Sequence, residues 1–221
     1  MGLNDTPVQY APAVFEDVSQ PEGKVSIMIQ LLRAPGYPRM PWKNGAGTTL
    51  EIMRDAGVNL DGFGWRVSIA DIDEAGAFSS FAGYQRIISV LEGEGMCLSV
   101  DGADSRPLRA FDPYAFAGDS RVECRLLNGA IRDFNLIYAP QRYSARLQWL
   151  RIEQAQRLFS SAATVLLFSA GEGLQVNRQG DDCGVLGRYD CLGIGGDGKL
   201  LELTLSAPVA LNCCLIELTP L

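Results

Sequence analysis

The sequence predicts an all-β protein with little helix, and three observations support this prediction. Short runs of β-branched and apolar residues recur from Val25 onward, and Gly, Pro, Asn or Asp interrupts them roughly every eight to twelve residues. Only one short segment has a helix-like pattern. A gapless internal repeat covers much of the chain. This spacing is typical of antiparallel sandwiches and barrels.

The predicted elements follow one another in a simple order. Residues 1–24 are polar, contain three prolines and are predicted to form an arm rather than a packed element. Asn128-Gly129 lies between two apolar runs and predicts a type I′ hairpin. Ile152–Ser161 is predicted as a short helix. The runs predicted as strands are Val25–Leu32, Trp65–Ala70, Arg86–Leu91, Met96–Val100, Val122–Leu127 and Ile131–Tyr138.

The internal repeat emerges when the chain is shifted by 78 positions against itself, so that Gly93-Glu94-Gly95 falls on Gly171-Glu172-Gly173. Because the chain has 24 glycines, a single glycine match can arise by chance, but a gapless run of matches indicates a duplication. The repeat predicts two antiparallel barrels, the first at residues 25–141 and the second at 142–221. Further matches pair Gly102 with Gly180, Asp104 with Asp182, Leu108 with Leu186, Asp112 with Asp190, and Gly118-Asp119 with Gly196-Asp197.

Composition excludes several classes of function. The chain contains no histidine, which excludes Ser-His-Asp and Cys-His catalysis and His-ligated metal centres built from this chain alone. The six cysteines form no CxxC pair, so we expect buried thiols, no metal and no cofactor. A formal charge of −7 opposes nucleic-acid binding. Without a secretory start or a long apolar stretch, the sequence predicts a soluble cytoplasmic protein with no membrane contact.

Polar residues on the last strand of the first repeat indicate which barrel holds a site. Asp133 and Asn135 share one face of Ile131–Tyr138, and the shift of 78 matches them to the apolar Leu211 and Cys213. Arg86 similarly matches Thr164 and needs a partner or a ligand if buried. The alternative is that Asp133 and Arg86 pair with each other or with solvent at a barrel rim.

A second polar concentration lies upstream, in Met40–Ile52. Glycines there permit close backbone approach, a tryptophan offers a flat wall, and a lysine supplies a cation. The order of residues does not fit a phosphate loop, because the lysine precedes the glycines. A wide hairpin capped by the tryptophan is the alternative. The candidate ligand-binding residues in this segment are Trp42, Lys43, Asn44, Gly45, Thr49 and Glu51.

Two further segments supply candidate residues. Trp65–Ala70 alternates, which places Arg66 and Ser68 together on the face opposite the apolar residues. Phe78-Ser79-Ser80-Phe81 adds aromatic wall and a hydroxyl, so Ser79 and Phe81 complete the candidate set. Three cations, Lys43, Arg66 and Arg86, would together suit carboxylates.

Several blocks of sequence also resemble known families. A strand, a GxG turn and a second strand, followed by Gly-Asp and another strand, resemble a cupin, and their duplication resembles a bicupin, although the histidines of metal-binding cupins are replaced. The strings PWKNGAGTTLEI, WRVSIADI, GAFSSFAGYQRIISVLEGEG, FAGD and DFNLI resemble the HutD/Ves family. Matching motif positions are Trp42, Lys43, Asn44, Gly45, Gly47, Thr49, Glu51, Trp65, Arg66, Ser68, Phe78, Ser79, Phe81, Arg86, Gly118, Asp119, Asp133 and Asn135.

The resemblance implies a jelly-roll-like bicupin with a role near histidine utilisation. It implies a metal-free protein that binds formylglutamate or formiminoglutamate in the first barrel and moderates that pathway, and catalysis is not established for the family. A cofactor-free isomerase or lyase, with Lys43 or Glu51 as the base, is the alternative. A third hypothesis is that the more apolar second barrel docks a partner or forms a homodimer.

Overall fold

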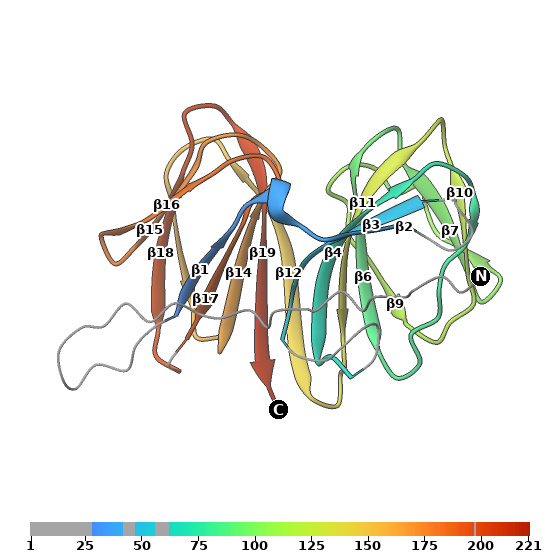
Figure 1. The fold of residues 1–221 in the computed structure, drawn as a ribbon, viewed down its shortest axis with the longest axis horizontal. Coiled ribbons are helices and arrows are strands. Elements are labelled where there is room, and N and C mark those ends of the chain that lie inside the picture. Colours follow the sequence, from blue (N-terminus) through green and yellow to red (C-terminus); the bar gives the residue numbers. More distant parts are fainter. Residues whose placement is uncertain (1–27, 42–46, 56–61, 197) are drawn as a thin grey trace, which may run out of the picture.

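The computed structural model describes residues 28–41, 47–55, 62–196 and 198–221. Their secondary structure is almost entirely antiparallel β-strand, and the one helical element is a 3-10 turn at Ala34–Gly36. Figure 1 shows two halves side by side, with strands β12 to β19 of the second half in yellow to red. The predicted all-β class is therefore confirmed.

Each half is a sandwich of two sheets. In the first half a six-stranded sheet has the order β2-β3-β4-β11-β6-β9, and a four-stranded sheet has the order β5-β10-β7-β8. The hydrogen bonding among the described residues defines separate sheets rather than the closed barrels that the sequence predicted. The strands are β2 (Arg39–Pro41), β3 (Gly47–Arg54), β4 (Trp65–Ile72), β5 (Gly76–Ala77), β6 (Gln85–Glu92), β7 (Met96–Val100), β8 (Ala103–Asp104), β9 (Tyr114–Ala117), β10 (Val122–Leu126) and β11 (Ile131–Tyr138).

The second half repeats this arrangement. A five-stranded sheet has the order β1-β17-β14-β19-β12 and a four-stranded sheet the order β13-β18-β15-β16. We call the six- and five-stranded sheets the inner sheets and the four-stranded ones the outer sheets. The strands are β1 (Ile29–Leu32), β12 (Tyr143–Ile152), β13 (Gln156–Ser160), β14 (Thr164–Ser169), β15 (Leu174–Arg178), β16 (Asp181–Leu186), β17 (Cys191–Gly195), β18 (Leu201–Ser206) and β19 (Leu211–Pro220).

Three apolar cores hold the four sheets together as layers. One core lies inside each sandwich, and the third lies between the two inner sheets, where Phe134 and Leu136 of β11 meet Phe168 of β14. The central strands of an inner sheet are therefore covered on both faces, and their side chains alternate between two interiors. This explains why β4 and β11 are buried along almost their whole length.

Backbone geometry in the two halves repeats at the predicted offset of 78. The non-glycine residues Asp101 and Gln179 both have positive φ, and so do Phe111 and Tyr189. Left-handed backbone is uncommon outside glycine, so its recurrence at equivalent places indicates that the two halves share the same backbone conformation there. Strand β7, shifted by 78, coincides with β15. An internal duplication is our interpretation of this repeat.

Two local predictions are wrong. Ile152–Ser161 forms the end of β12, a turn and strand β13 rather than a helix, because β12 pairs with β19 and β13 with β18. Pairing with two different sheets outweighs a weak local helical preference. Asn128-Gly129 is not a hairpin turn, since β10 pairs with β7 and β5, whereas β11 pairs with β4 and β6. That turn carries the chain from the outer to the inner sheet.

The segment before β2 links the two halves. Strand β1 pairs with β17 of the second half, although the boundary at residue 25 places it with the first barrel. The chain then crosses to β2 (Figure 1). Asp190 fixes the crossing, because its carboxylate accepts hydrogen bonds from Arg33 Nη1 at 2.6 Å and from the Ala34 backbone N–H at 2.9 Å. These bonds, with the salt bridge to Arg33, hold the pKa of Asp190 below its usual value despite burial.

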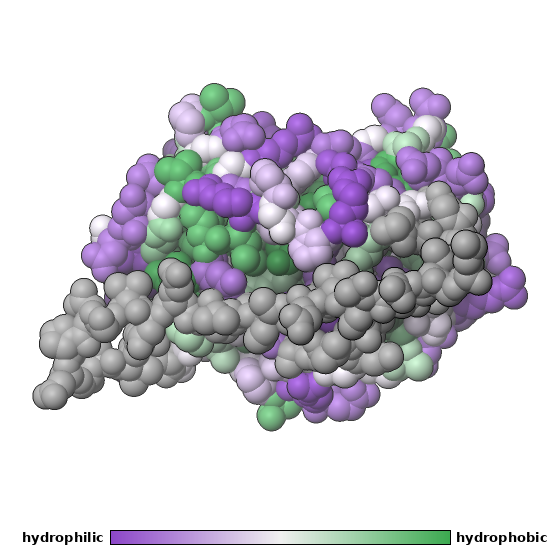
Figure 2. Space-filling view, in the orientation of Figure 1, coloured by the Kyte–Doolittle hydropathy of each residue, from purple (hydrophilic) through white to green (hydrophobic). Residues whose placement is uncertain are grey.

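Among the described residues, no helix is long and apolar enough to cross a membrane. Figure 2 shows apolar residues gathered over part of the second half on one face of the molecule. Exposed large apolar side chains include Val185 and Val209 of that half.

Candidate functional site

A polar cluster lies inside the first sandwich, on the face of the inner sheet that looks toward the outer sheet. Strand register places its residues in rows, because directly paired residues share a face. In one row Arg66 of β4 and Arg86 of β6 flank Ile137 of β11. In the next row Ser68 lies beside Asn135. We call the buried residues Glu51, Arg66, Ser68, Arg86, Asp133 and Asn135, together with Arg54, the interior polar cluster.

Glu51 is enclosed by two arginines. Its carboxylate accepts hydrogen bonds from Arg54 Nε at 2.6 Å and from Arg66 Nε at 2.8 Å. Sequence reasoning did not select Arg54, since period-two alternation puts residues 51 and 54 on opposite faces. A bulge between Glu51 and Met53 shifts the register and returns Arg54 to the cluster. Glu51 is therefore a charge partner with both oxygens engaged.

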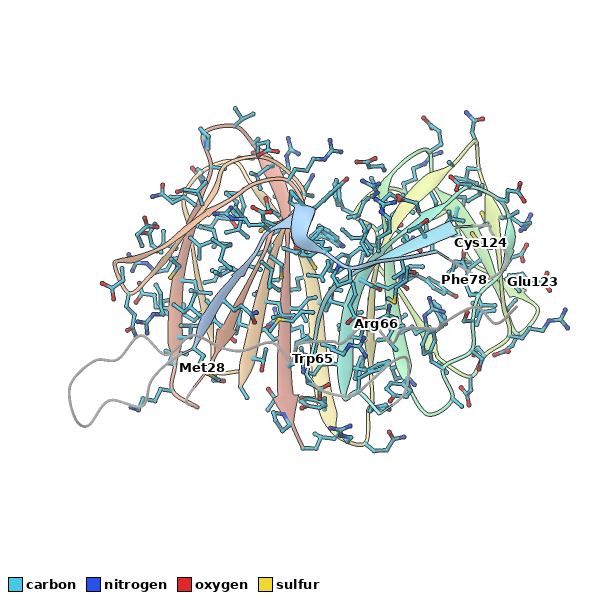
Figure 3. The ribbon with its side chains drawn as sticks, in the orientation of Figure 1. Met28, Trp65, Arg66, Phe78, Glu123 and Cys124 are labelled. Carbon is cyan, nitrogen blue, oxygen red and sulfur yellow. The ribbon has the colours of Figure 1, made fainter. Side chains whose placement is uncertain are left out.

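Arg86 is held in an aromatic collar. Its guanidinium carbon lies 5.2 Å from the ring centroid of Phe78, 5.5 Å from Phe81 and 5.0 Å from Phe116, within cation–π range. Figure 3 labels Phe78 of this collar and Arg66 of the same polar cluster, both in the first half. Only 6% of Arg86 is exposed. Burial lowers the pKa of Arg86 to about 10, against an opposing effect of the nearby Asp133.

The hydrogen bonds of Arg86 are incomplete. Nη2 donates to Asn135 Oδ1 at 2.9 Å and Nη1 to the backbone carbonyl of Ser79 at 3.3 Å. Nε is buried, and no acceptor in the described part of the chain reaches it. A buried charged donor without an acceptor is costly, so it marks a place for an acceptor from outside the described residues.

Asp133 is the most deeply buried ionisable group of the cluster. It is 1% exposed, and its Oδ1 accepts a hydrogen bond from Asn135 Nδ2 at 2.7 Å. Desolvation raises the pKa of Asp133 to about 7, although the charge of Arg86 and a hydrogen bond from the Ala70 backbone favour the carboxylate. Asp133 therefore changes charge near neutral pH.

The cluster has an excess of positive charge. Three arginines face two carboxyl groups, Glu51 and Asp133, and the second carboxyl is neutral below about pH 7. Arginine forks and an aromatic wall favour a small planar anion. The part of the chain that the structure describes contains no group of three or more His, Cys, Asp or Glu side chains arranged to hold a metal ion.

Most predicted ligand residues converge on this place. Glu51, Arg66, Ser68, Arg86, Asp133 and Asn135 line the cluster, Phe81 belongs to the collar, and Ser79 contributes a carbonyl rather than its hydroxyl. Thr49 shares the face, since it pairs with Ala70. Phe116 was missed, because only the pairing of β9 with β6 brings it to Arg86. Trp42, Lys43, Asn44 and Gly45 lie outside the described residues.

In the equivalent interior of the second half, the residues that match Arg86, Asp133 and Asn135 are apolar, although Glu217 stands where the first half has Ile137 and the register differs from the gapless match. Val165 pairs with Ile194 and Glu217, as Arg86 pairs with Phe116 and Ile137, so Val165 rather than Thr164 is its counterpart. Following the pairs along β19, Asp133 corresponds to Cys213 and Asn135 to Leu215. The predicted matches were therefore one or two residues out of register. The correct counterparts, Val165, Cys213 and Leu215, are nevertheless apolar, as the sequence predicted for this barrel.

Two surface hollows lie away from the cluster. One, of about 750 Å³, is lined by Arg33, Glu172, Val185 and Val209 of the second half and the segment before β2. The other, of about 380 Å³, includes Arg39, Asp71, Glu92 and Arg132. Among the described residues that line them, neither hollow has a buried polar atom without a hydrogen-bond partner. We therefore favour the interior polar cluster as the binding site, although the hollows are large.

The paired two-sheet halves define a cupin-like all-β protein. AerE from Microcystis aeruginosa shares this fold, with a TM-score of 0.61 at 12% identity. The HutD family profile matches residues 34–212, and the chain belongs to the HutD family. It is 61% identical over 190 residues to an uncharacterised 21.2 kDa protein in the hutC 3′ region of Pseudomonas putida, covering 86% of this chain and 97% of that protein.

Solved structures agree with this assignment. HutD from Pseudomonas fluorescens has 55% identity and a TM-score of 0.76, covering 87% of this chain and 99% of that one. A conserved protein of unknown function from Pseudomonas aeruginosa has 57% identity and a TM-score of 0.85, with coverage of 86% and 98%. Protein Ves from Citrobacter koseri is 39% identical over 108 residues, covering 48% of this chain and 56% of its own length.

Proposed function

We propose that this chain is a metal-free binding protein for a small acidic metabolite, held in the interior polar cluster of the first half. The observation that carries the proposal is the buried Nε of Arg86, which lacks an acceptor from the described residues inside an arginine-rich, aromatic-lined interior. The apolar counterpart in the second half supports it, because the fold itself does not require these charges.

The ligand that we propose is formylglutamate or formiminoglutamate, and the protein moderates the pathway that produces it. Membership of the HutD family and a relative in a hutC region support this choice. Both molecules carry two carboxylates. Arg66 and Arg86 stand two strands apart, about 10 Å at the backbone, and their long side chains can reach inward to separate carboxylates. Asn135 and Ser68 lie alongside to bond the polar atoms between them.

The other predicted ligand residues complete this proposal. Trp42, Lys43, Asn44 and Gly45 belong to the segment between β2 and β3, and Lys43 remains a predicted third cation for a carboxylate. Cytoplasmic location, a homodimer, and the lack of nucleic-acid contact also remain predictions.

Calorimetric titration with N-formyl-L-glutamate, with and without chelator, tests the proposed function. Arg86→Met should weaken binding about 100-fold or more, since removing one partner of a buried charge pair costs roughly 2–5 kcal/mol. Arg132→Met is the matched control, because Arg132 lies on the other face of β11 and pairs with Asp71. Equal affinity in wild type and Arg86→Met would place the ligand elsewhere, and chelator-sensitive binding would contradict the metal-free site.

A cofactor-free isomerase or lyase is the second candidate. Glu51 is a poor base here, because both of its oxygens accept hydrogen bonds from arginines. Asp133, with a pKa raised to about 7 by burial, is the better acid or base. Turnover of N-formyl-L-glutamate or a related diacid that is lost in Asp133→Asn would support this candidate, and recovery of unchanged compound after long incubation would remove it.

A further inference from the structure

We propose that Asp133 is a built-in counter-anion for Arg86, so that an acidic ligand binds with uptake of one proton by Asp133. This inference rests on the proposed function and adds its regulation, since ligand occupancy would then depend on pH around neutrality.

The geometry couples the two residues through one amide. Arg86 Nη2 donates to Asn135 Oδ1 at 2.9 Å, and Asn135 Nδ2 donates to Asp133 Oδ1 at 2.7 Å. All three side chains are buried on the same face of β6 and β11. Nε of Arg86 stays open to a further acceptor. Asp133 thus balances the charge of Arg86 through Asn135, without a direct hydrogen bond to it. The Nε of Arg86 is left for direct contact with a ligand.

The surroundings of Asp133 give it few other partners. From β4 the Ala70 backbone donates a hydrogen bond, and Arg66 lies further along that strand. From β3 come Glu51 and Arg54, which bond to each other. The outer sheet contributes the thiol of Cys124, whose pKa burial raises to about 12, and apolar side chains. Asp71, on the opposite face of β4, adds a weak repulsion that favours the protonated acid.

Two carboxylates beside a single arginine in a buried interior repel each other, and this repulsion raises the free energy of the doubly charged state. A ligand carboxylate on Arg86 adds a second negative charge close to Asp133, and like charges raise the pKa of a carboxyl group. The protein carboxylate therefore takes a proton from solvent as the ligand carboxylate arrives. For Arg86, Asp133 and the ligand carboxylate that binds Arg86, the summed charge is the same before and after. By linkage, each proton taken up makes affinity fall about tenfold per pH unit above the pKa.

Titration calorimetry with N-formyl-L-glutamate, in paired buffers of different ionisation enthalpy, measures the protons taken up. At pH 8 the wild type should take up close to one proton per ligand, and its Kd should rise about tenfold per pH unit between pH 7.5 and 9. Asp133→Asn keeps the size and the acceptor for Asn135, so it should bind without proton uptake, with flat pH dependence, and about tenfold or more tighter at pH 8.5. Asp71→Asn is the matched control: it should still take up a proton on binding, with its pH dependence moved only slightly toward lower pH because the weak repulsion from Asp71 is lost.

A second measurement does not depend on a variant. Carbon-13 NMR of aspartate carboxyls in the wild type should show one group that titrates near pH 7 without ligand and stays protonated at pH 8 with it. Binding without proton uptake, or uptake that persists in Asp133→Asn, would overturn the inference while leaving the binding function intact. Failure of the probe to bind at any pH from 6 to 9 would overturn both.

Discussion

The two halves share the order of four inner-sheet strands, β4-β11-β6-β9 and β12-β19-β14-β17, but differ in what their inner sheets enclose. In the first half Arg86 of β6 and Asp133 and Asn135 of the neighbouring strand β11 share one face, and in the second half Val165 of β14 and Cys213 and Leu215 of β19 occupy the corresponding places. All six are buried. The second half shows that this sandwich folds with apolar residues at these three positions, so the charges at the matching positions of the first half serve something other than folding.

A carboxyl group placed in the second half should destabilise the fold. Cys213→Asp should lower the free energy of unfolding by about 4 kcal/mol at pH 8, because Cys213 is fully buried and no cation stands at Val165. Chemical denaturation at pH 5 and pH 8 measures the loss. Recovery of part of the stability at pH 5 is expected, as the acid becomes neutral there, and an equal loss at both pH values would mean that packing alone is disturbed.

Removal of the charge of Asp133 is the reverse substitution in the first half. The folded pKa of Asp133, about 7, lies above its ordinary value, so the folded state holds a proton more tightly than the unfolded chain. Its penalty accordingly grows as pH rises from about 4 to 7 and is complete above 7. Asp133→Asn should raise the free energy of unfolding of the unliganded protein by up to about 4 kcal/mol at pH 8, and by little at pH 4. A destabilised variant at pH 8 would argue that the Arg86 pair stabilises the fold.

The contact between the halves includes one hydrogen bond from a tryptophan. Trp149 of β12 donates through Nε1 to Ser89 Oγ of β6 at 2.9 Å, inside the core that joins the inner sheets. Trp149→Phe should cost about 1 kcal/mol of unfolding free energy and leave ligand affinity unchanged. A double-mutant cycle with Ser89→Ala isolates the bond, and simple additivity would show that the hydrogen bond contributes nothing.

Much of the fold was predictable because strand alternation and turn residues are local signals. Met96–Val100 and Ile131–Tyr138 were predicted with their observed bounds. The last of these runs also placed Asp133 and Asn135 on one face, since a strand has period two. Whether the sheets close into barrels, and which strands the Asn128-Gly129 turn joins, depends on long-range pairing that a single sequence does not encode locally.

The missing parts of the site have physical reasons of the same kind. Arg54 enters the cluster only through the bulge after Glu51, and a bulge breaks the alternation from which faces are read. Phe116 reaches Arg86 from a strand 30 positions away by sheet pairing. The counterpart of Arg86 was misassigned by one residue, because the gapless offset of 78 does not extend through β14. The register of a strand depends on its pairing with distant strands, which the local sequence does not determine.

Binding of a carboxylate by Arg86, inside the interior polar cluster of the first half, can be seen in a crystal structure of the complex with N-formyl-L-glutamate. We expect a carboxylate oxygen about 2.8 Å from Arg86 Nε, within the collar of Phe78, Phe81 and Phe116. Ligand density in the surface hollow beside Arg33, with the interior cluster unchanged, would contradict it.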